Sequence, residues 1–235
     1  MRTGIIWFRN ALRLNDNRML IECLNSTNSE AILPLYILDK SELKLKNNDN
    51  RIKFLYESLI DLDVHFKAKF GSNLIILNGR CEEIFGKLLG NDLLDVSEIF
   101  TDYSNKPDDV ENENSLKRIL TKNTSVNLYL ISKVNSLINI EEVVNQENFK
   151  APKTMKDMEK LFSNLFPKDE SGFYSVDEPL DIPESSKSVL DNYSKIVKEY
   201  LFDIEKELSL LKKDSKSYFK GGESEALVRL ERKVS

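Results

Sequence analysis

The feature that most constrains the fold is the alternation of short apolar runs with amphipathic stretches across the first 131 residues. A short apolar run between polar residues is typical of a buried strand, and apolar residues three or four apart indicate a helix. Strands separated by helices need crossover connections, which make neighbouring strands parallel. We therefore predict an α/β fold with a Rossmann-like, doubly wound, five-stranded parallel sheet, with strands at 4–8, 31–38, 73–77, 98–102 and 126–131 and helices at 19–24, 51–70, 82–89 and 110–122.

The pattern changes after residue 135, and we predict three regions: an α/β domain at 1–135, a helical extension and linker at 136–220, and the start of a further helix at 221–235. Apolar residues at helical spacing indicate one long amphipathic helix over 188–213. Its stripe either covers the sheet or another helix, which we favour, or binds a protein partner. The other expectations here are short helices at 140–144 and 154–165, a proline-rich surface segment at 167–183, and a break at Gly221 and Gly222 before a helix at 223–234.

Composition excludes several classes of site. The net charge of −5 argues against direct nucleic-acid binding, which needs clustered cations. Two cysteines without a paired motif and a single histidine, His65, predict no metal site. Neither a glycine-rich dinucleotide motif nor a P-loop follows the first strand, which disfavours a generic nucleotide-binding protein. No uncharged apolar stretch is long enough to span a membrane, and we expect a cytoplasmic or nuclear protein.

Four segments, at residues 7–17, 36–39, 51–63 and 221–231, carry recognisable motifs. The first has Trp-Phe-Arg, then Leu-Arg, then Asp-Asn, and the second is a strand ending Tyr-Ile-Leu-Asp. The third is a helix with Phe-Leu and Ser-Leu-Ile-Asp-Leu-Asp, and the fourth is Gly-Gly-Glu-Ser-Glu-Ala-Leu. Together, and in this order, these segments resemble the photolyase/cryptochrome family, nearest its animal cryptochrome and (6-4) photolyase branch.

The resemblance implies that two parts of such a protein have different roles. It implies that the α/β part holds an antenna chromophore, a folate or deazaflavin, with contacts from Arg9, Arg13, Asp39, Asp102 and Tyr103. FAD, the electron-transfer tryptophans and the lesion-binding surface belong in this family to a helical domain after the Gly-Gly-Glu linker. We therefore expect no catalytic residue and no enzyme activity in this chain alone, FAD binding only in a longer chain, and a role in blue-light reception, circadian regulation or DNA repair when joined to a FAD domain.

The residues themselves leave other interpretations open. Arg9 and Arg13 either contact a chromophore or form ion pairs with Asp16, Asp39 or a neighbouring domain, and we favour ion pairs. Asp63 is expected to be a solvated or capping charge rather than a general base, and His65 to be structural. The alternative function is a stand-alone protein-interaction module without chromophore, binding through the 188–213 helix.

Overall fold

A five-stranded parallel sheet forms the centre of the computed structural model, which describes residues 2–39, 49–91, 94–122, 125–135, 143–165, 193, 195–211 and 219–234. All four strand pairs are parallel, in the order β3-β2-β1-β4-β5. The predicted fold class is confirmed. The strands are β1 (Arg2–Phe8), β2 (Ala31–Leu38), β3 (Ile75–Asn78), β4 (Asp95–Asp102) and β5 (Asn127–Ile131).

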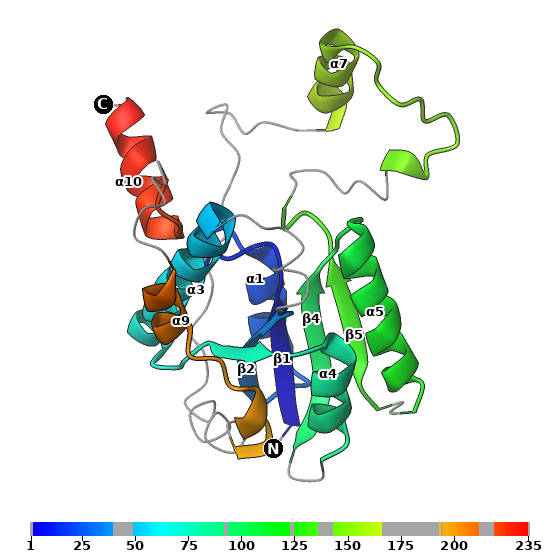
Figure 1. The fold of residues 1–235 in the computed structure, drawn as a ribbon. Helices are drawn as coiled ribbons and strands as arrows, with labels where there is room; N and C mark the ends of the chain where they lie inside the picture. The colour runs from blue at the N-terminus through cyan, green and yellow to red at the C-terminus, as the bar shows by residue number, and fades with distance from the viewer. Residues whose placement is uncertain are drawn as a thin grey trace.

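Helices cover both faces of the sheet (Figure 1). One apolar core lies between the sheet and the helices α1 (Arg18–Asn25), α3 (Asp49–Phe70) and α9 (Ile204–Leu210). The other lies under α4 (Cys81–Leu89) and α5 (Pro107–Leu120). Successive side chains of a strand point to opposite faces, so β1 supplies Ile6 and Phe8 to the first core and Ile5 and Trp7 to the second. This double burial explains why the strands are apolar throughout.

A side-chain cap begins α1. Asn17 is fully buried, and its side-chain oxygen accepts from the backbone N–H of Leu20 at 3.3 Å. This bond satisfies one of the helix's free amides. The side-chain nitrogen of Asn17 donates to the carbonyl of Arg13 at 2.8 Å, which also holds the loop between β1 and α1.

The predicted continuous helix over 188–213 is wrong for the residues described. A short 3-10 helix, η1 (Lys198–Tyr200), is followed by extended chain, in which the amide of Phe202 donates to the carbonyl of Ile76 at 3.0 Å. β3 is an edge strand with free backbone groups, so the chain pairs with it there instead of continuing as a helix. Asp203 then caps α9 by accepting from the amide of Lys206 at 3.0 Å.

The apolar residues of that segment nevertheless belong largely to the hydrophobic core. Tyr193 and Val197 are fully buried in the cluster beneath α4, and Ile204, the first residue of α9, is buried in the other core. Leu201 is the exception, because its side chain is 46% exposed. The interpretation of the stripe as a covering of the sheet therefore holds for these three buried residues.

Two further helices lie where the sequence predicted them, α7 (Met155–Leu165) and α10 (Glu223–Val234). In Figure 1, α10 rises from one end of α3 and α7 stands away from the sheet. The predictions for 140–142 and 167–183 lie outside the described residues. In the part of the chain described, no helix is both long and apolar enough to cross a membrane. The cytoplasmic or nuclear location stays a prediction.

Candidate functional site

The strand order creates a crevice between β1 and β4. From β1 the chain runs outward through β2 and β3, then crosses to β4 on the other side of β1. In open α/β sheets, ligands bind outside the carboxyl ends of the strands at such a switch point. A pocket of about 170 Å³ lies there, lined by Trp7, Arg9, Asn10, Tyr36, Ile37, Asp39, Gly79, Cys81, Lys106, Asp108, Asp109 and Asn112.

Arg9 organises the floor of this carboxyl-edge pocket. The register pairs Trp7 with Thr101, so the residues that follow β1 lie beside those that end β4. The Arg9 guanidinium therefore reaches Asp102 at 3.4 Å and Glu113 of α5 at 2.9 Å, and its charge lies 5.0 Å from the centre of the Trp7 ring. All three charged side chains are at most 6% exposed. Arg9 thus compensates two carboxylates that would be costly to bury alone.

Asn10 connects the pocket wall to the buried charges. Its amide nitrogen lies 2.9 Å from a carboxylate oxygen of Asp102 and 2.9 Å from one of Asp109, and its oxygen accepts from the Lys106 ammonium. Asp109 also accepts from the Ser104 hydroxyl at 2.5 Å. These bonds hold the polar wall in one geometry before any ligand arrives, which lowers the cost of ordering it on binding.

The charge of the pocket limits what it can bind. Three carboxylates, Asp39, Asp108 and Asp109, line it against two cations, Arg9 and Lys106. Arg9 is already paired with Asp102 and Glu113 behind the wall. The local balance is therefore negative, which suits a ligand rich in N–H donors and opposes phosphate groups.

Size is a second limit. Pockets that enclose whole drug-sized ligands span roughly 300–1,000 Å³. A volume of about 170 Å³ lies below that range, so this pocket can enclose only part of such a ligand. Among the described residues, no cluster of three or more His, Cys, Asp or Glu could hold a metal ion.

The structure separates the five residues predicted to contact an antenna. Arg9 and Asp39 line the pocket. Asp102 is completely buried behind it and acts on the wall through Arg9 and Asn10. Tyr103 and Arg13 are not among the lining residues. Their roles toward a chromophore stay predictions.

Both arginines form ion pairs, as the favoured interpretation of Arg9 and Arg13 predicted. Arg13 lies 3.8 Å from the Asp16 carboxylate and donates to the carbonyl of Val134 at 2.6 Å. For Arg9 the expected partners were wrong, because its carboxylates come from Asp102 and Glu113.

Sequence reasoning missed the contribution of α5. The sequence predicted a helix over 110–122 and gave no role to Asp109 or Glu113, but these residues are four positions apart and therefore share one face of α5. Residues 103–106 separate the end of β4 from Pro107, which begins α5, and this face of α5 is directed at the loop after β1, where Arg9 contacts Asp109. The available signal for this pairing was the four-residue spacing of the two acids, together with an arginine, Arg9, for which the sequence offered no other buried partner.

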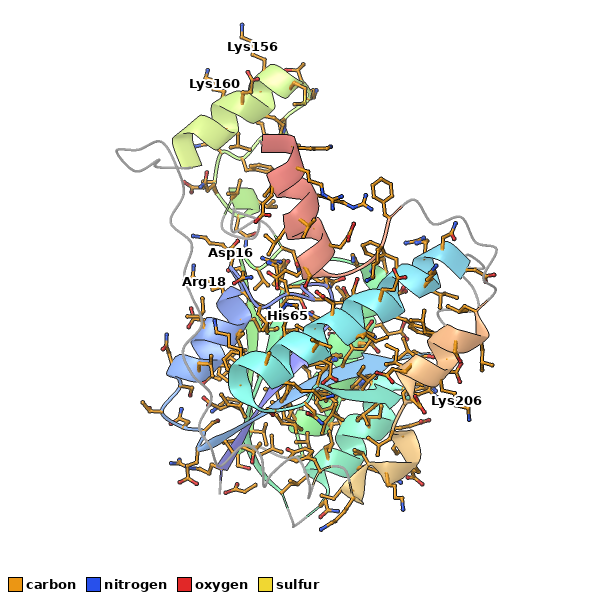
Figure 2. All side chains as sticks on the ribbon, turned by 90° about the vertical axis from the view of Figure 1, so that its left-hand side faces the viewer. Asp16, Arg18, His65, Lys156, Lys160 and Lys206 are labelled. Atoms are coloured by element: carbon orange, nitrogen blue, oxygen red, sulfur yellow. The ribbon has the colours of Figure 1, made fainter. Side chains whose placement is uncertain are left out.

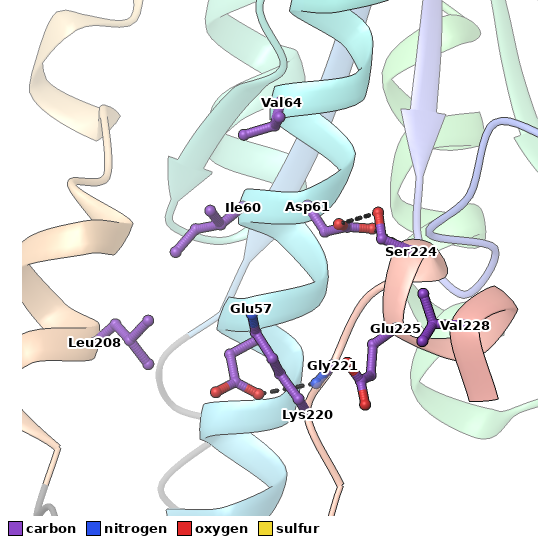
Figure 3. A pocket seen from close by; sticks show the side chains of 10 residues that line it. All are labelled: Glu57, Ile60, Asp61, Val64, Leu208, Lys220, Gly221, Ser224, Glu225 and Val228. Carbon is purple, nitrogen blue, oxygen red and sulfur yellow. Dashed lines mark hydrogen bonds between the residues drawn. The ribbon is translucent and has the colours of Figure 1, made fainter. Parts of the chain in front are cut away.

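A second polar junction joins the segments that carry the family resemblance. Glu57 of α3 accepts from the amide of Gly221 at 2.8 Å, and Asp61 accepts from the amide of Ser224 at 3.1 Å and its hydroxyl at 2.6 Å (Figure 3). Gly222 has φ = 114° and lies against Asp61, so only glycine fits without strain. The Gly-Gly-Glu motif thus fixes the beginning of α10 on α3.

Asp63 and His65 follow their expected structural roles. Asp63 accepts from the amide of Leu74 at 2.8 Å and from Lys67 at 2.7 Å, which anchors the chain entering β3. The His65 ring contacts the carbonyl of Asp61 and the hydroxyl of Ser224.

Comparison with known proteins places this geometry in a family. The family model for DNA photolyase matches residues 4–171. Cryptochrome-1 of Spalax judaei is 28% identical over 245 residues, and cryptochrome-1 of Mus musculus is 26% identical over 239 residues. Each comparison covers 97% of this chain but 37% and 36% of the relative. The chain therefore spans little more than a third of the length of these relatives.

Solved structures show the same fold. A cryptochrome from Synechocystis has a TM-score of 0.66 at 22% identity, covering 99% of this chain and 46% of that one. A class III photolyase from Agrobacterium tumefaciens has a TM-score of 0.69 at 18% identity, over 98% and 44% of the two chains. The Sulfolobus tokodaii photolyase, described as holding two FAD molecules and implying a novel light-harvesting cofactor, has a TM-score of 0.66 at 18% identity, over 97% and 46%. The fold and the family match over more than half of its length together establish that this chain belongs to the DNA photolyase family.

Proposed function

We propose that this chain is the ligand-binding α/β part of a cryptochrome- or photolyase-type protein, and that its carboxyl-edge pocket holds one end of an antenna chromophore of the folate or deazaflavin class. The observation that carries the proposal is the rigid, acidic pocket at the β1/β4 switch point. Carboxylates accept hydrogen bonds from the N–H groups of a pterin or deazaflavin ring, and Trp7 and Tyr36 supply aromatic surface.

A flavin dinucleotide would fit this pocket poorly as the antenna. The solved Sulfolobus tokodaii photolyase carries two FAD molecules. Here a pyrophosphate would approach Asp108 and Asp109, with Lys106 as the single lining cation not paired with buried carboxylates. The charge balance therefore favours a compact heterocycle over a dinucleotide.

The light-driven reactions of the family need a flavin, and we assign no step of them to these residues. When this α/β part is joined to a FAD-binding part, the expected role is that of a blue-light photoreceptor, circadian regulator or repair enzyme. In that assembly the proposed task of the described residues is to hold and orient the antenna. No residue of the pocket is proposed to be catalytic.

The single tryptophan makes the proposal directly testable. Trp7 lines the pocket and is the only tryptophan in the chain, so its fluorescence reports on this site alone. Titration with 5,10-methenyltetrahydrofolate or 8-hydroxy-5-deazaflavin is expected to quench Trp7 fluorescence with saturation, while FAD leaves it unchanged. Saturable quenching by FAD would contradict the proposal. Absence of saturable quenching by both antenna compounds would contradict it as well.

Two variants separate binding from folding. Asp108 and Lys106 are exposed and line the pocket, so Asp108→Asn and Lys106→Ala should leave the fold intact. Asp108→Asn is expected to weaken binding of the N–H-rich compound at least about tenfold, because a hydrogen bond to a charged group is worth about 1.5–3 kcal/mol. Asp16→Asn, in an exposed position outside the pocket, is the matched control and should bind like the wild type.

A stand-alone interaction module remains the second candidate, because apolar side chains are exposed on α10. Leu227 and Leu230 are 45% and 60% exposed, and Phe219 just before the helix is 63% exposed. In the segment first considered for a partner, Leu201 is exposed whereas Leu208 packs against the core. Leu201→Asp is therefore the informative variant there: loss of a captured partner with an intact fold would favour this candidate, and unchanged capture would count against that segment as the contact.

A further inference from the structure

The chain that follows η1 returns to the sheet at its β3 edge. Leu201 forms an isolated antiparallel bridge with Leu77, and the amide of Phe202 donates to the carbonyl of Ile76 at 3.0 Å. In Figure 2 this segment belongs to the pale orange ribbon that leads into α9, where Lys206 is labelled. A segment that the sequence assigned to the linker thus lies against an edge strand of the sheet.

The ring of Tyr200 packs against a glycine of the carboxyl-edge pocket. Gly79 follows β3 and lines the pocket with backbone atoms, since it has no side chain. A β-carbon added to Gly79 would lie 3.0 Å from Tyr200 Cδ1 and 3.3 Å from Tyr200 Cε1, with Ile84 Cδ1 also at 3.3 Å. These distances are tighter than ordinary van der Waals contact. The Tyr200 ring therefore fills the space toward which a side chain at position 79 would point.

Contacts with α4 and the core hold Tyr200 in this position. Lys87 of α4 forms an ion pair with Glu199, and its ammonium lies 5.0 Å from the centre of the Tyr200 ring. That pair is exposed and contributes little by itself. The amide of Tyr200 also donates to the carbonyl of Val197 at 2.8 Å, and Val197 is fully buried under α4. The position of the ring is therefore set by folding, before any ligand binds.

The turn that Tyr200 contacts carries one wall of the pocket. The amide of Gly79 donates to the carbonyl of Leu38 at 3.1 Å, which ties the turn to the end of β2. Asp39 follows Leu38, and Cys81 begins α4. Asp39, Gly79 and Cys81 all line the pocket. A displaced turn would therefore move these lining residues together.

We propose that Tyr200 is a positioning residue of the antenna site, which sets the geometry of the wall formed by Asp39, Gly79 and Cys81. The inference rests on the proposed function of the pocket. Tyr200 is not among the lining residues and acts through Gly79. The ligand site therefore depends on a part of the chain that lies beyond the predicted α/β domain at 1–135.

Antenna affinity measured on the full chain tests this role. Titration of Trp7 fluorescence with 5,10-methenyltetrahydrofolate or 8-hydroxy-5-deazaflavin gives a dissociation constant for each variant, under conditions where circular dichroism shows it to be folded. Tyr200→Ala is expected to weaken binding about three- to tenfold, which lies within the coupling found between residues in contact. Tyr200→Phe should bind like the wild type, because the ring and not the hydroxyl meets Gly79. Leu201→Ala, at a neighbouring side chain that is 46% exposed, is the matched control and should also bind like the wild type.

A double substitution separates this contact from a general loss of stability. Gly79→Ala adds a β-carbon that meets the Tyr200 ring, so it should weaken binding in the otherwise wild-type chain. In the Tyr200→Ala background the same β-carbon meets only Ile84, and its effect on affinity should be at least about threefold smaller. Urea unfolding of the same four proteins should show non-additivity of the same sign.

The possible results separate this role from the function of the pocket. If the wild type binds neither compound, the proposed antenna function fails and the role of Tyr200 fails with it. If the wild type binds and Tyr200→Ala binds equally tightly, only the role of Tyr200 is overturned. Additive effects of Gly79→Ala and Tyr200→Ala would overturn it too, as would a Tyr200→Phe variant that binds as weakly as Tyr200→Ala.

Discussion

The carboxylate of Glu223 accepts a hydrogen bond of 2.9 Å from the backbone amide of Leu14, 209 residues earlier in the chain. Its second oxygen accepts from the amide of Asn15 at 3.1 Å. Together with Glu57 and Asp61 on α3, it fixes the start of α10 to two separate parts of the α/β domain. The attachment relies on carboxylates accepting backbone N–H groups, which are strong bonds because the acceptor is charged.

Removal of the Glu223 carboxylate should therefore loosen α10. Glu223→Ala leaves the amides of Leu14 and Asn15 without their acceptor and is expected to cost about 1–2 kcal/mol, since both bonds are charge-assisted but partly solvated. Urea unfolding followed by circular dichroism measures the change. Glu147→Ala, at an exposed position, is the control and should alter stability by less than about 0.5 kcal/mol. Equal effects of the two variants would contradict this role.

Arg9 should be the most sensitive of the arginines. Arg9→Met leaves Asp102 and Glu113 buried without a counter-charge, and breaking a buried pair in this way typically costs about 3–5 kcal/mol. Arg18→Met removes an exposed pair with Glu22 and is expected to cost at most about 0.5 kcal/mol. Thermal unfolding of both variants gives the comparison. A loss below about 1 kcal/mol for Arg9→Met would show that water reaches these carboxylates.

Glu98, at the opposite edge of the sheet, should make stability depend on pH. Its side chain is buried, which alone raises the pKa of the carboxyl group. Hydrogen bonds from Ser26 at 2.6 Å, Asn28 at 3.2 Å and Ser29 at 2.9 Å, with a further one from Tyr129, outweigh burial and hold the pKa below its usual value. A lowered folded-state pKa means that the stabilisation is present above the ordinary carboxyl pKa and lost as the pH falls through the folded-state value.

Glu98→Gln is therefore expected to be less stable than the wild type at pH 7, with a difference that shrinks below about pH 4. Urea midpoints measured at pH 7, 5 and 3 test this. Glu22→Gln, on the exposed surface, should show no such convergence. A difference that stays constant from pH 7 to pH 3 would mean that the charge of Glu98 is not what its hydrogen bonds stabilise.

Tyr193 should be a position where removal of a polar atom stabilises the protein. Its ring is fully buried, and its hydroxyl has no hydrogen-bond partner among the described residues. Burial also raises the pKa of this phenol far above its usual value. Tyr193→Phe is expected to gain about 1 kcal/mol, because the unpaired hydroxyl no longer has to leave water.

The matched variant is Tyr129→Phe, which removes a donor to Glu98 and should lower stability. Urea unfolding at pH 7 compares the signs of the two changes. The advantage of Tyr193→Phe should widen above about pH 10, where a free tyrosine ionises and the buried phenol of the wild type does not. A destabilised Tyr193→Phe would show that the hydroxyl is hydrogen-bonded after all.

The five-stranded sheet was predictable because burial on both faces leaves a local signature. Strands such as 31–38 are apolar throughout, and helices such as 51–70 repeat apolar residues at helical spacing. The break in the predicted 188–213 helix was not predictable from the stripe. Leu201 and Phe202 are helix-compatible residues, and they leave the helix because the free edge of β3 lies beside them.

For the pocket, too, some features were predictable from local sequence and others depended on the tertiary structure. That Arg9 and Asp39 follow strands, and so lie at the carboxyl edge, followed from the sequence pattern alone. That Asp102 is buried, that Glu113 is the second partner of Arg9, and that Glu223 binds the loop after β1 depended on strand order and register. Periodicity is a property of neighbouring residues, whereas the contacts of Arg9 with Asp102 and of Glu223 with Leu14 join residues 93 and 209 positions apart. The sequence by itself determined the layers of this protein, and only the tertiary structure decided which charges meet, because long-range partners are set by packing and not by spacing.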